Sequence, residues 1–345
     1  CLVTQVSETY NSINNMKIKS VQIANLWGEF DLSIDLNSDV NILVGGNGAG
    51  KSTLLKLINA VIPPHRVPEY LSEKVDKVKL LFDDNSVINC VNFRDSFKKL
   101  KDKAAADPSY KTMYDDISED ISERKKSRLN FKISVSSRNF YRNGQEISGN
   151  FFFDNVNTSF LSTFDTPLPK EEELSSTFSD MMDERPMSHL DKKLFDIMES
   201  YSYYIGKLAN IIEKKVLQDE DIDKHFLEEV YRQKNLFGDI INSMFQDSGK
   251  RMDLSNPKPE FYTEKGKKLS IYDLSSGEKQ ALYIFLKVLV QNKKDYILLM
   301  DEPEISLHVD WQQKLIDNIL RLNPNCQIIV STHSPSMLFE GWDDK

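Results

Sequence analysis

The sequence predicts an α/β fold in which a mostly parallel sheet carries an antiparallel β-lobe and an inserted helical subdomain. Three patterns support this prediction. A short apolar strand enters a glycine-rich turn and then a helix, residues 183–250 repeat apolar side chains at helical spacing, and two continuous apolar strands near the C-terminus flank another helix. Continuous apolar strands are typical of parallel sheets that are buried on both faces.

The N-terminal part reads as strands. Apolar side chains at positions 18, 21 and 23 and at positions 30, 32, 34 and 36 predict two strands, joined by a turn at residues 25–28. Residues 78–82 and 87–93 flank Asp83-Asp84-Asn85, while residues 131–135 and 139–142 precede Asn143-Gly144. Turn residues between such runs predict hairpins, which would extend an antiparallel β-lobe.

A strand, a loop and a helix follow one another near residue 50. Residues 41–44 form the short apolar strand, and the helix is indicated by Leu54, Leu55, Leu57, Ile58 and Val61, which repeat at helical spacing until Pro63-Pro64.

The helical insertion rests on two apolar stripes. The first comprises Leu190, Leu194, Met198, Tyr201, Ile205, Leu208 and Ile212, and the second comprises Phe226, Val230, Phe237, Ile241 and Phe245. Stripes with this period predict amphipathic helices whose apolar face is core. Ser188 followed by Asp191 offers an N-cap for the first helix.

From Phe261 strand patterns return, with Leu269 and Ile271 leading into Leu274-Ser275-Ser276-Gly277-Glu278-Lys279-Gln280. We expect a helix at residues 281–291, a strand at 296–300, a helix at 311–322 and a strand at 327–330. This alternation predicts doubly wound α/β structure for the C-terminal third.

Composition limits the function classes. The chain has 345 residues with 40% hydrophobic side chains, enough for a sizeable core. Its 44 basic and 53 acidic residues give a net charge of −9, so nucleic-acid binding is possible only through a local basic patch. The basic runs at residues 98–103 and 124–128 are interpreted as solvated faces, with nucleic-acid contact as the alternative.

Cys1, Cys90 and Cys326 lie far apart without a CxxC pair, which argues against a zinc site or a disulfide framework. The sequence contains no apolar stretch of the length that spans a bilayer, and no charged-then-apolar leader is visible. We therefore expect a cytoplasmic protein with no membrane partner.

The glycine-rich turn carries the strongest motif. Gly45-Gly46-Asn47-Gly48-Ala49-Gly50-Lys51-Ser52 matches the phosphate loop GxxxxGK[ST] and is followed by Thr53. Backbone N–H groups of such a loop face phosphates at a helix N-terminus, Lys51 would neutralise the β- and γ-phosphates, and Ser52 would bind Mg²⁺. The motif predicts a P-loop NTPase that binds ATP with Mg²⁺.

A second motif supplies carboxylates. The strand Ile297-Leu298-Leu299-Met300 ends in Asp301 and Glu302. Asp301 would hold Mg²⁺ with Ser52, and Glu302 would orient and deprotonate the attacking water. An acidic strand end alone is common at a solvated surface, but its combination with a phosphate loop favours catalysis.

These residues resemble the ATP-binding cassette family. Leu274-Ser275-Ser276-Gly277-Glu278 is similar to its signature motif, Asp301-Glu302-Pro303-Glu304 to its Walker B motif, and Ser331-Thr332-His333-Ser334-Pro335 to its switch histidine. The resemblance implies that Ser275 and the Gly277 amide contact ATP held by a second copy, and that His333 contacts the γ-phosphate of its own ATP. It therefore implies a homodimer through an ATP sandwich. The alternatives are a helix cap for Ser275, a role that we also expect, and an ordinary surface or core histidine.

Further residues indicate which branch of the ATP-binding cassette family this chain resembles. The long interval between Lys51 and Ser275 disfavours a transporter subunit. The run containing Glu304, Leu307 and His308 resembles soluble ATPases of the overcoming-lysogenization-defect class and of retron and Septu (PtuA-like) defence systems. It resembles RecF and SMC heads more distantly. His308 stands where transporters carry the aspartate of the D-loop. No glutamine follows the strand at residues 159–164 to form a Q-loop, although Asp165 could substitute. Trp27 is a candidate for stacking on adenine, with a packing role as the favoured alternative.

The resemblance implies an organisation and a function. We expect an upstream extension at residues 1–15, an N-terminal ATPase lobe with the β-subdomain at 16–180, the helical insertion at 181–255 and a C-terminal ATPase lobe at 256–345. The expected function is ATP hydrolysis in which dimer closure controls a separate effector nuclease in antiphage defence, because only twelve residues follow His333 and residues 334–342 contain no acidic cluster. The alternatives are a RecF-like DNA repair or recombination clamp and an ATP-gated scaffold with little turnover.

Overall fold

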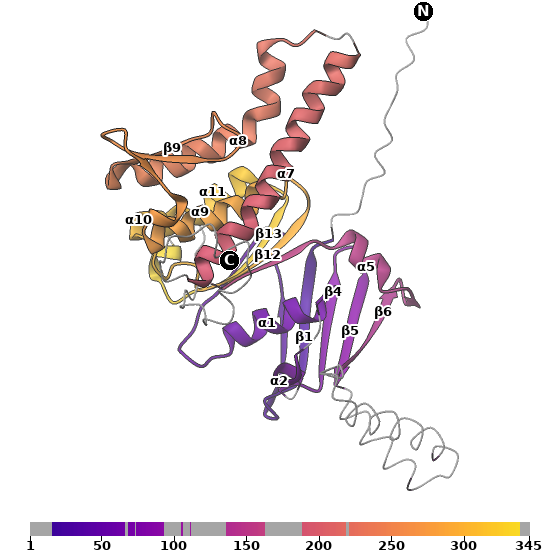
Figure 1. Ribbon diagram of the computed structural model, residues 1–345. Coiled ribbons are helices and arrows are strands. Elements are labelled where there is room, and N and C mark those ends of the chain that lie inside the picture. The colour runs from indigo at the N-terminus through magenta and orange to yellow at the C-terminus, as the bar shows by residue number, and fades with distance from the viewer. Residues whose placement is uncertain are drawn as a thin grey trace, which may run out of the picture.

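The computed structural model describes residues 16–65, 68–72, 74–92, 136–162, 188–218 and 221–338, together with positions 105 and 111. Several expectations lie outside these residues: the extension at 1–15, the basic runs at 98–103 and 124–128, the strand at 131–135 and the Q-loop position Asp165. The described chain forms two large sheets and a set of helices that surround one of them (Figure 1).

The first sheet is the antiparallel β-lobe that the sequence predicts. Its strands are β1 (Ile18–Leu26), β2 (Phe30–Asp35), β4 (Lys77–Phe82), β5 (Ser86–Asn92), β6 (Ser136–Arg142) and β7 (Gln145–Glu146), in the order β2-β1-β4-β5-β6-β7. Asn85 and Asn143 occupy the two predicted turns with φ of 62° and 49°. Asparagine tolerates this left-handed region better than most residues, which explains its place in both turns. The short helices α2 (Glu69–Ser72) and α5 (Asn150–Asn155) adjoin the lobe.

The second sheet is parallel and draws strands from both ends of the chain. Its order is β3-β13-β12-β8, formed by β3 (Val40–Leu43), β13 (Cys326–Ser331), β12 (Tyr296–Asp301) and β8 (Thr158–Ser162). The register pairs Asp301 with both Ser331 and Ser162, and Ser331 with Leu43. The carboxyl ends of the four strands therefore lie level at one edge of the sheet.

Side chains alternate between the two faces of this sheet. Ile297, Leu299 and Ile329 share a core with the β-lobe and α1 (Lys51–Val61). Leu298 and Met300 belong to a second core with α7 (His189–Leu217), α8 (Lys224–Phe245), α9 (Ser276–Leu289) and α11 (Leu315–Leu322). Because successive side chains of a strand point to opposite faces, α1 and α9 pack on opposite sides of the sheet.

The insertion forms a helical pair, α7 and α8, that extends away from both sheets (Figure 1). Ser188 and Asp191 form the predicted capping box at the start of α7. The inner ends of the pair pack into the same core as α9, and an ion pair between Lys279 and Asp191, 2.7 Å long, joins α9 to α7.

Residues 250–253 form β9 (Lys250–Asp253), which pairs with β10 (Glu260–Thr263), itself beside β11 (Lys268–Leu269), so residues 255 and 256 lie in the connection between two paired strands. Two expected helix boundaries are corrected. Helix α9 begins at Ser276 and not at Ala281, because Ser275 and Glu278 form a capping box. The expected helix at 311–322 is two helices, α10 (Val309–Gln313) and α11, since Lys314 leaves helical geometry with φ −97° and ψ 0°.

Short 3-10 turns complete the described chain: η2 (Gln246–Ser248), η3 (Ile271–Asp273) and η4 (Pro335–Leu338). Ile271 therefore begins a turn and does not extend a strand. Among the helices that the structure describes, none combines the length and apolar character that crossing a bilayer requires. Cys90 and Cys326 are buried free thiols.

Candidate nucleotide-binding site

The phosphate loop connects β3 to α1 at the level edge of the parallel sheet, and residues 45–49 are exposed. Gly48 and Gly50 have φ of 81° and 90°, a region where side chains are strained and glycine is not. A Cβ atom on Gly50 would lie 2.5 Å from the ring of Trp27, so this tryptophan packs against the loop. The packing role considered for Trp27 is therefore present in the structure.

The start of α1 is suited to an anion. Gly50 is the N-cap of α1 and makes no side-chain capping hydrogen bond, so the first-turn N–H groups are not engaged by a cap. The Lys51 ammonium group sits over the same loop, donating to the carbonyl oxygens of Gly45 and Gly46 at 2.8 and 3.2 Å. Phosphate oxygens are stronger acceptors for an ammonium group than carbonyls are, so this loop fits a polyphosphate.

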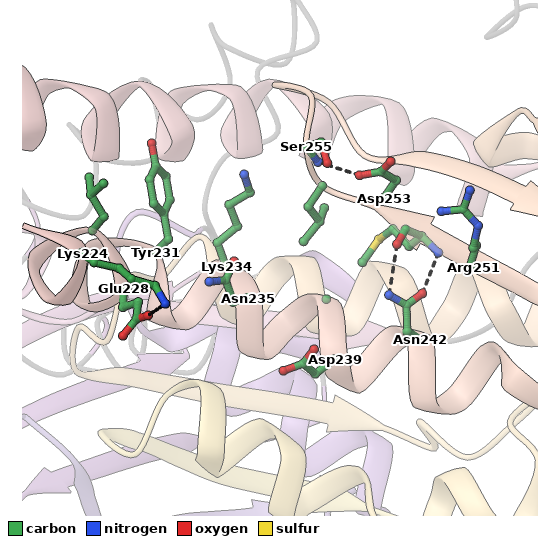
Figure 2. A pocket seen from close by; sticks show the side chains of 14 residues that line it. Lys224, Glu228, Tyr231, Lys234, Asn235, Asp239, Asn242, Arg251, Asp253 and Ser255 are labelled. Carbon is green, nitrogen blue, oxygen red and sulfur yellow. Dashed lines mark hydrogen bonds and ion pairs between the residues drawn. The ribbon is translucent and has the colours of Figure 1, made fainter.

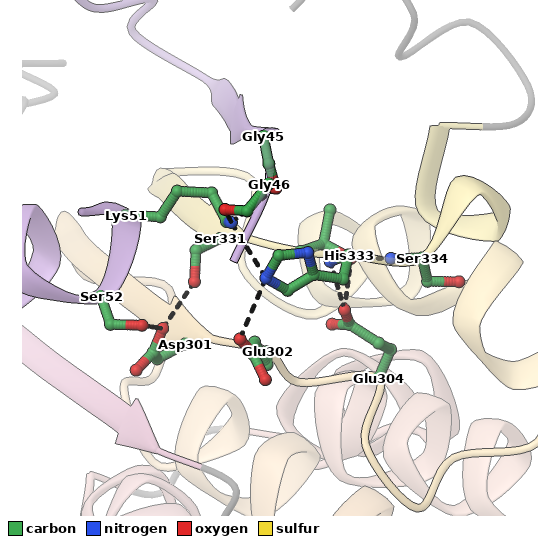
Figure 3. A network of polar contacts seen from close by, with 11 residues as sticks. Gly45, Gly46, Lys51, Ser52, Asp301, Glu302, Glu304, Ser331, His333 and Ser334 are labelled. Atoms are coloured by element: carbon green, nitrogen blue, oxygen red, sulfur yellow. Dashed lines mark hydrogen bonds and ion pairs between the residues drawn. The ribbon is translucent and has the colours of Figure 1, made fainter. Parts of the chain in front are cut away.

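Two strand ends meet the helix at Asp301. The Ser52 hydroxyl donates to Asp301 Oδ1 at 2.7 Å, and the Ser331 hydroxyl donates to the same atom at 2.6 Å (Figure 3). Asp301 is buried. A hydroxyl and a carboxylate are hard oxygen ligands of the kind Mg²⁺ prefers, so this pair fits the ion that accompanies ATP. No role was predicted for Ser331 from the sequence. The parallel register of β12 and β13 pairs it with Asp301.

His333 lies between a cation and a carboxylate. Its Nε2 atom is 2.9 Å from Lys51 Nζ and 3.4 Å from Glu302 Oε1 (Figure 3). Because an ammonium group can only donate, Nε2 accepts in the contact with Lys51. Glu302 has φ of 51°, a conformation that costs a non-glycine residue about 1–3 kcal/mol. Its N–H donates to Ser331 O at 2.9 Å, which holds this turn in place.

The contacts of Glu304 were not predicted from the sequence. Its Oε1 atom accepts from the Thr332 hydroxyl at 2.6 Å and from the His333 N–H at 2.8 Å, and its side chain is buried. The acidic residue after Pro303 was visible in the motif, but nothing local indicated that it would hold the backbone of His333.

The predicted signature residues lie elsewhere. Ser275 caps α9, and both Ser275 and Ser276 are exposed. A cavity of about 670 Å³ opens beside them, lined by residues 247–248, 275–278 and 306–308 and by Trp311. The phosphate loop, Asp301, Glu302 and His333 thus meet at one edge, whereas Ser275 and Gly277 belong to the helix on the other face of the sheet.

Glu278 anchors the start of α9, the helix that carries Gly277 and is capped by Ser275. Burial alone would raise the pKa of this carboxyl, but the Lys250 ammonium at 2.7 Å, the Ser248 hydroxyl at 2.7 Å and the Ser275 N–H at 2.7 Å lower the pKa overall. The carboxylate is 2% exposed and ties η2 and β9 to the first turn of α9.

A separate groove of about 620 Å³ lies between α8 and the residues around β9, and it shares no residue with the phosphate loop (Figure 2). Asn242 spans its floor, exchanging hydrogen bonds of 2.6 and 3.0 Å with the backbone of Met252. Burial lowers the pKa of Lys234 in its wall. Its cationic side chains alternate with Glu228, Asp239 and Asp253, so it presents no single charge to a ligand.

Comparison with known proteins places these residues in a family context. A family model described as "AAA domain, putative AbiEii toxin, Type IV TA system" matches residues 40–338. Retron Vc95 probable ATPase of Vibrio cholerae serotype O1 biovar El Tor is 30% identical over 147 residues, which make up 39% of this chain and 28% of the relative. Septu protein PtuA of Bacillus thuringiensis is 25% identical over 333 residues, covering 93% of this chain and 72% of the relative.

Among solved structures, the SMC head domain from Thermotoga maritima superposes with a TM-score of 0.48 at 14% identity, covering 94% of this chain and 91% of that domain. This chain spans little more than a quarter of the length of the retron relative, at 28%.

Proposed function

This chain belongs to the family of AAA domains matched above, and from that membership we propose that it binds Mg-ATP and hydrolyses it. One observation carries the proposal: four strands of different origin in the sequence end level, and they bring Lys51, Ser52, Asp301, Glu302 and His333 to one edge. The hydrogen bonds among them hold the Lys51 ammonium group, the oxygen atoms of Ser52 and Asp301 and the Glu302 carboxylate next to the N-terminus of α1, where an anion is favoured.

Each residue then has a role in the proposed reaction. Lys51 and the backbone N–H groups of the loop, with Thr53 in the first turn of α1, bind the phosphates. Ser52 and Asp301 would hold Mg²⁺, which when bound would neutralise phosphate charge and polarise the P–O bond that breaks. Glu302 accepts a proton from the attacking water. Once Lys51 donates to the phosphates instead of to His333, the Nε2–H tautomer of His333 donates to the γ-phosphate.

The signature residues suggest that the active unit is a homodimer. Ser275 is exposed at the start of α9, on the face of the sheet opposite α1. A second copy, turned by a twofold axis, would present Ser275 and Gly277 to the phosphates bound by the first, and the α9 N-terminus would add its dipole. ATP-dependent closure of such a dimer is the proposed conformational output.

We further propose that this closure controls a separate effector, a nuclease, in antiphage defence. The relatives are named as a retron ATPase and a Septu protein, and the family description names a toxin–antitoxin system, which supports an ATPase that regulates another activity.

Mixing two inactive variants tests the composite site. Ser275→Arg and Lys51→Ala chains should each lack hydrolysis, and titrating one into the other should restore phosphate release at the one intact site of each heterodimer. Light scattering with ATP in a Glu302→Gln background should report dimers. A monomer whose specific activity is independent of concentration would refute the dimer, and ATP-dependent binding to DNA ends without an effector would favour a repair clamp.

A further inference from the structure

The turn that follows β12 touches both halves of the proposed composite site. At its start, Glu304 Oε1 accepts from the His333 N–H at 2.8 Å. Two residues later, the Ser306 carbonyl packs against Gly277, where a Cβ atom would lie 2.3 Å from that oxygen. Ser306 has φ of 74°, in the left-handed region, so the backbone turns sharply at this residue. The same five-residue turn, residues 304–308, therefore contacts the switch histidine on one side and the signature helix on the other.

One side chain on α10 holds this turn. Gln312 Nε2 donates to Leu307 O at 2.9 Å and to Glu304 O at 3.3 Å. Its Oε1 accepts from the Ser334 hydroxyl at 2.7 Å. Because carbonyl oxygens only accept, the amide nitrogen must face the turn, and the amide oxygen then faces the residue next to His333.

We propose that Gln312 is a positioning residue that couples His333 to the signature helix. This inference rests on the proposed ATP-bound dimer. When His333 engages the γ-phosphate, its backbone and Ser334 are connected through Glu304 and Gln312 to the turn that supports Gly277. Gly277 has no side chain to adjust and its neighbour is backbone, so a displacement of the turn is passed on to the start of α9. ATP bound by one copy thereby sets the geometry with which that copy contacts its partner's ATP.

A purely structural role for Gln312 makes a different prediction. If the amide only stabilised α10, its loss would lower the melting temperature and weaken every function together. If Gln312 is a positioning residue, its loss should weaken the ATP-dependent association of two chains and leave the affinity of the isolated chain for ATP nearly unchanged.

The test uses Gln312→Glu, a substitution of nearly the same shape that replaces the donor with an acceptor, in the Glu302→Gln background. Equilibrium binding of a fluorescent ATP analogue to dilute protein should change by less than about threefold. The ATP-dependent dimerisation constant from analytical ultracentrifugation should weaken by about 10- to 100-fold, because two hydrogen bonds are lost and two carbonyls face a carboxylate. Gln313→Glu, next on the same helix, introduces the same charge outside this network and should leave both values unchanged.

Ser334→Ala provides a second variant that spares the turn. It should weaken dimerisation about 2- to 10-fold, and combining it with Gln312→Glu should add little, since both interrupt one connection. Additive effects, or Gln312→Glu protein that dimerises like its parent, would overturn the proposal. Lost ATP binding with a lowered melting temperature would assign Gln312 a structural role and overturn it too. Failure of the Glu302→Gln parent to dimerise with ATP would instead remove the proposed dimer itself.

Discussion

The hydroxyl of Ser52 lies 2.7 Å from Oδ1 of Asp301, although 249 positions separate the two residues in the sequence. β13 lies between β3 and β12 and is parallel to both, so the three strands end at one edge of the sheet. Helix α1 follows β3 and packs on the sheet face that carries Leu299 and Ile329, which brings Ser52 to the last residue of β12.

Lys51→Ala should weaken ATP binding by at least about 10- to 100-fold, because a charge-assisted hydrogen bond to phosphate is worth about 1.5–3 kcal/mol. Isothermal titration calorimetry measures this directly. Lys56→Ala, at another lysine of α1, should bind ATP normally. Retained nucleotide affinity in Lys51→Ala would contradict the assignment of residues 45–52 as a phosphate-binding loop.

Glu302→Gln should retain ATP binding but slow hydrolysis by about 10²- to 10⁴-fold, since the amide cannot accept the proton of the attacking water. Phosphate release under saturating ATP provides the rate, and the calorimetric affinity provides the control. Turnover within a few-fold of the parent protein would show that another group is the base.

Gly277→Ala should destabilise the protein by about 1–3 kcal/mol, because the new Cβ would overlap the Ser306 carbonyl and one backbone segment must shift. Urea denaturation followed by circular dichroism gives the free energy of unfolding. Gly206→Ala is the control: Gly206 lies within α7, and a Cβ atom there would meet nothing within 4 Å, so alanine should stabilise by up to about 1 kcal/mol. Equal effects of the two substitutions would contradict the close packing at Gly277.

Glu278 should make stability depend on pH in the acid range. Its pKa is lower in the folded protein than in the unfolded chain, so the stabilisation is complete above the ordinary glutamate pKa of about 4.3 and is lost as pH falls through the folded value. Glu278→Gln should lose about 1.5–3 kcal/mol at pH 7 and show a shallower decline on acidification. Denaturant titrations of both proteins from pH 7 to pH 3 measure this. Parallel pH curves would place the acid sensitivity at other carboxylates.

Local features were predictable because their causes are local. The capping boxes Ser188 with Asp191 and Ser275 with Glu278 each need only a hydroxyl and a carboxylate three residues apart. The break at Lys314 and the pairing of β9 with β10 were not predicted, since the helical periodicity around residue 311 continues across the break and β9 follows directly on a helical stripe.

The sequence by itself determined the phosphate loop between a strand and a helix, and the acidic end of β12, because each is one uninterrupted segment whose residue types state their chemistry. Only the tertiary structure decided that Trp27 packs on Gly50, that Lys250 pairs with Glu278 and that Gln312 joins Ser334 to the turn beneath Gly277. These contacts depend on the order and register of the strands and on which helix covers which face. The strand order, the register and the placement of the helices depend on burial of apolar surface over the whole chain, so no short stretch of sequence determines them.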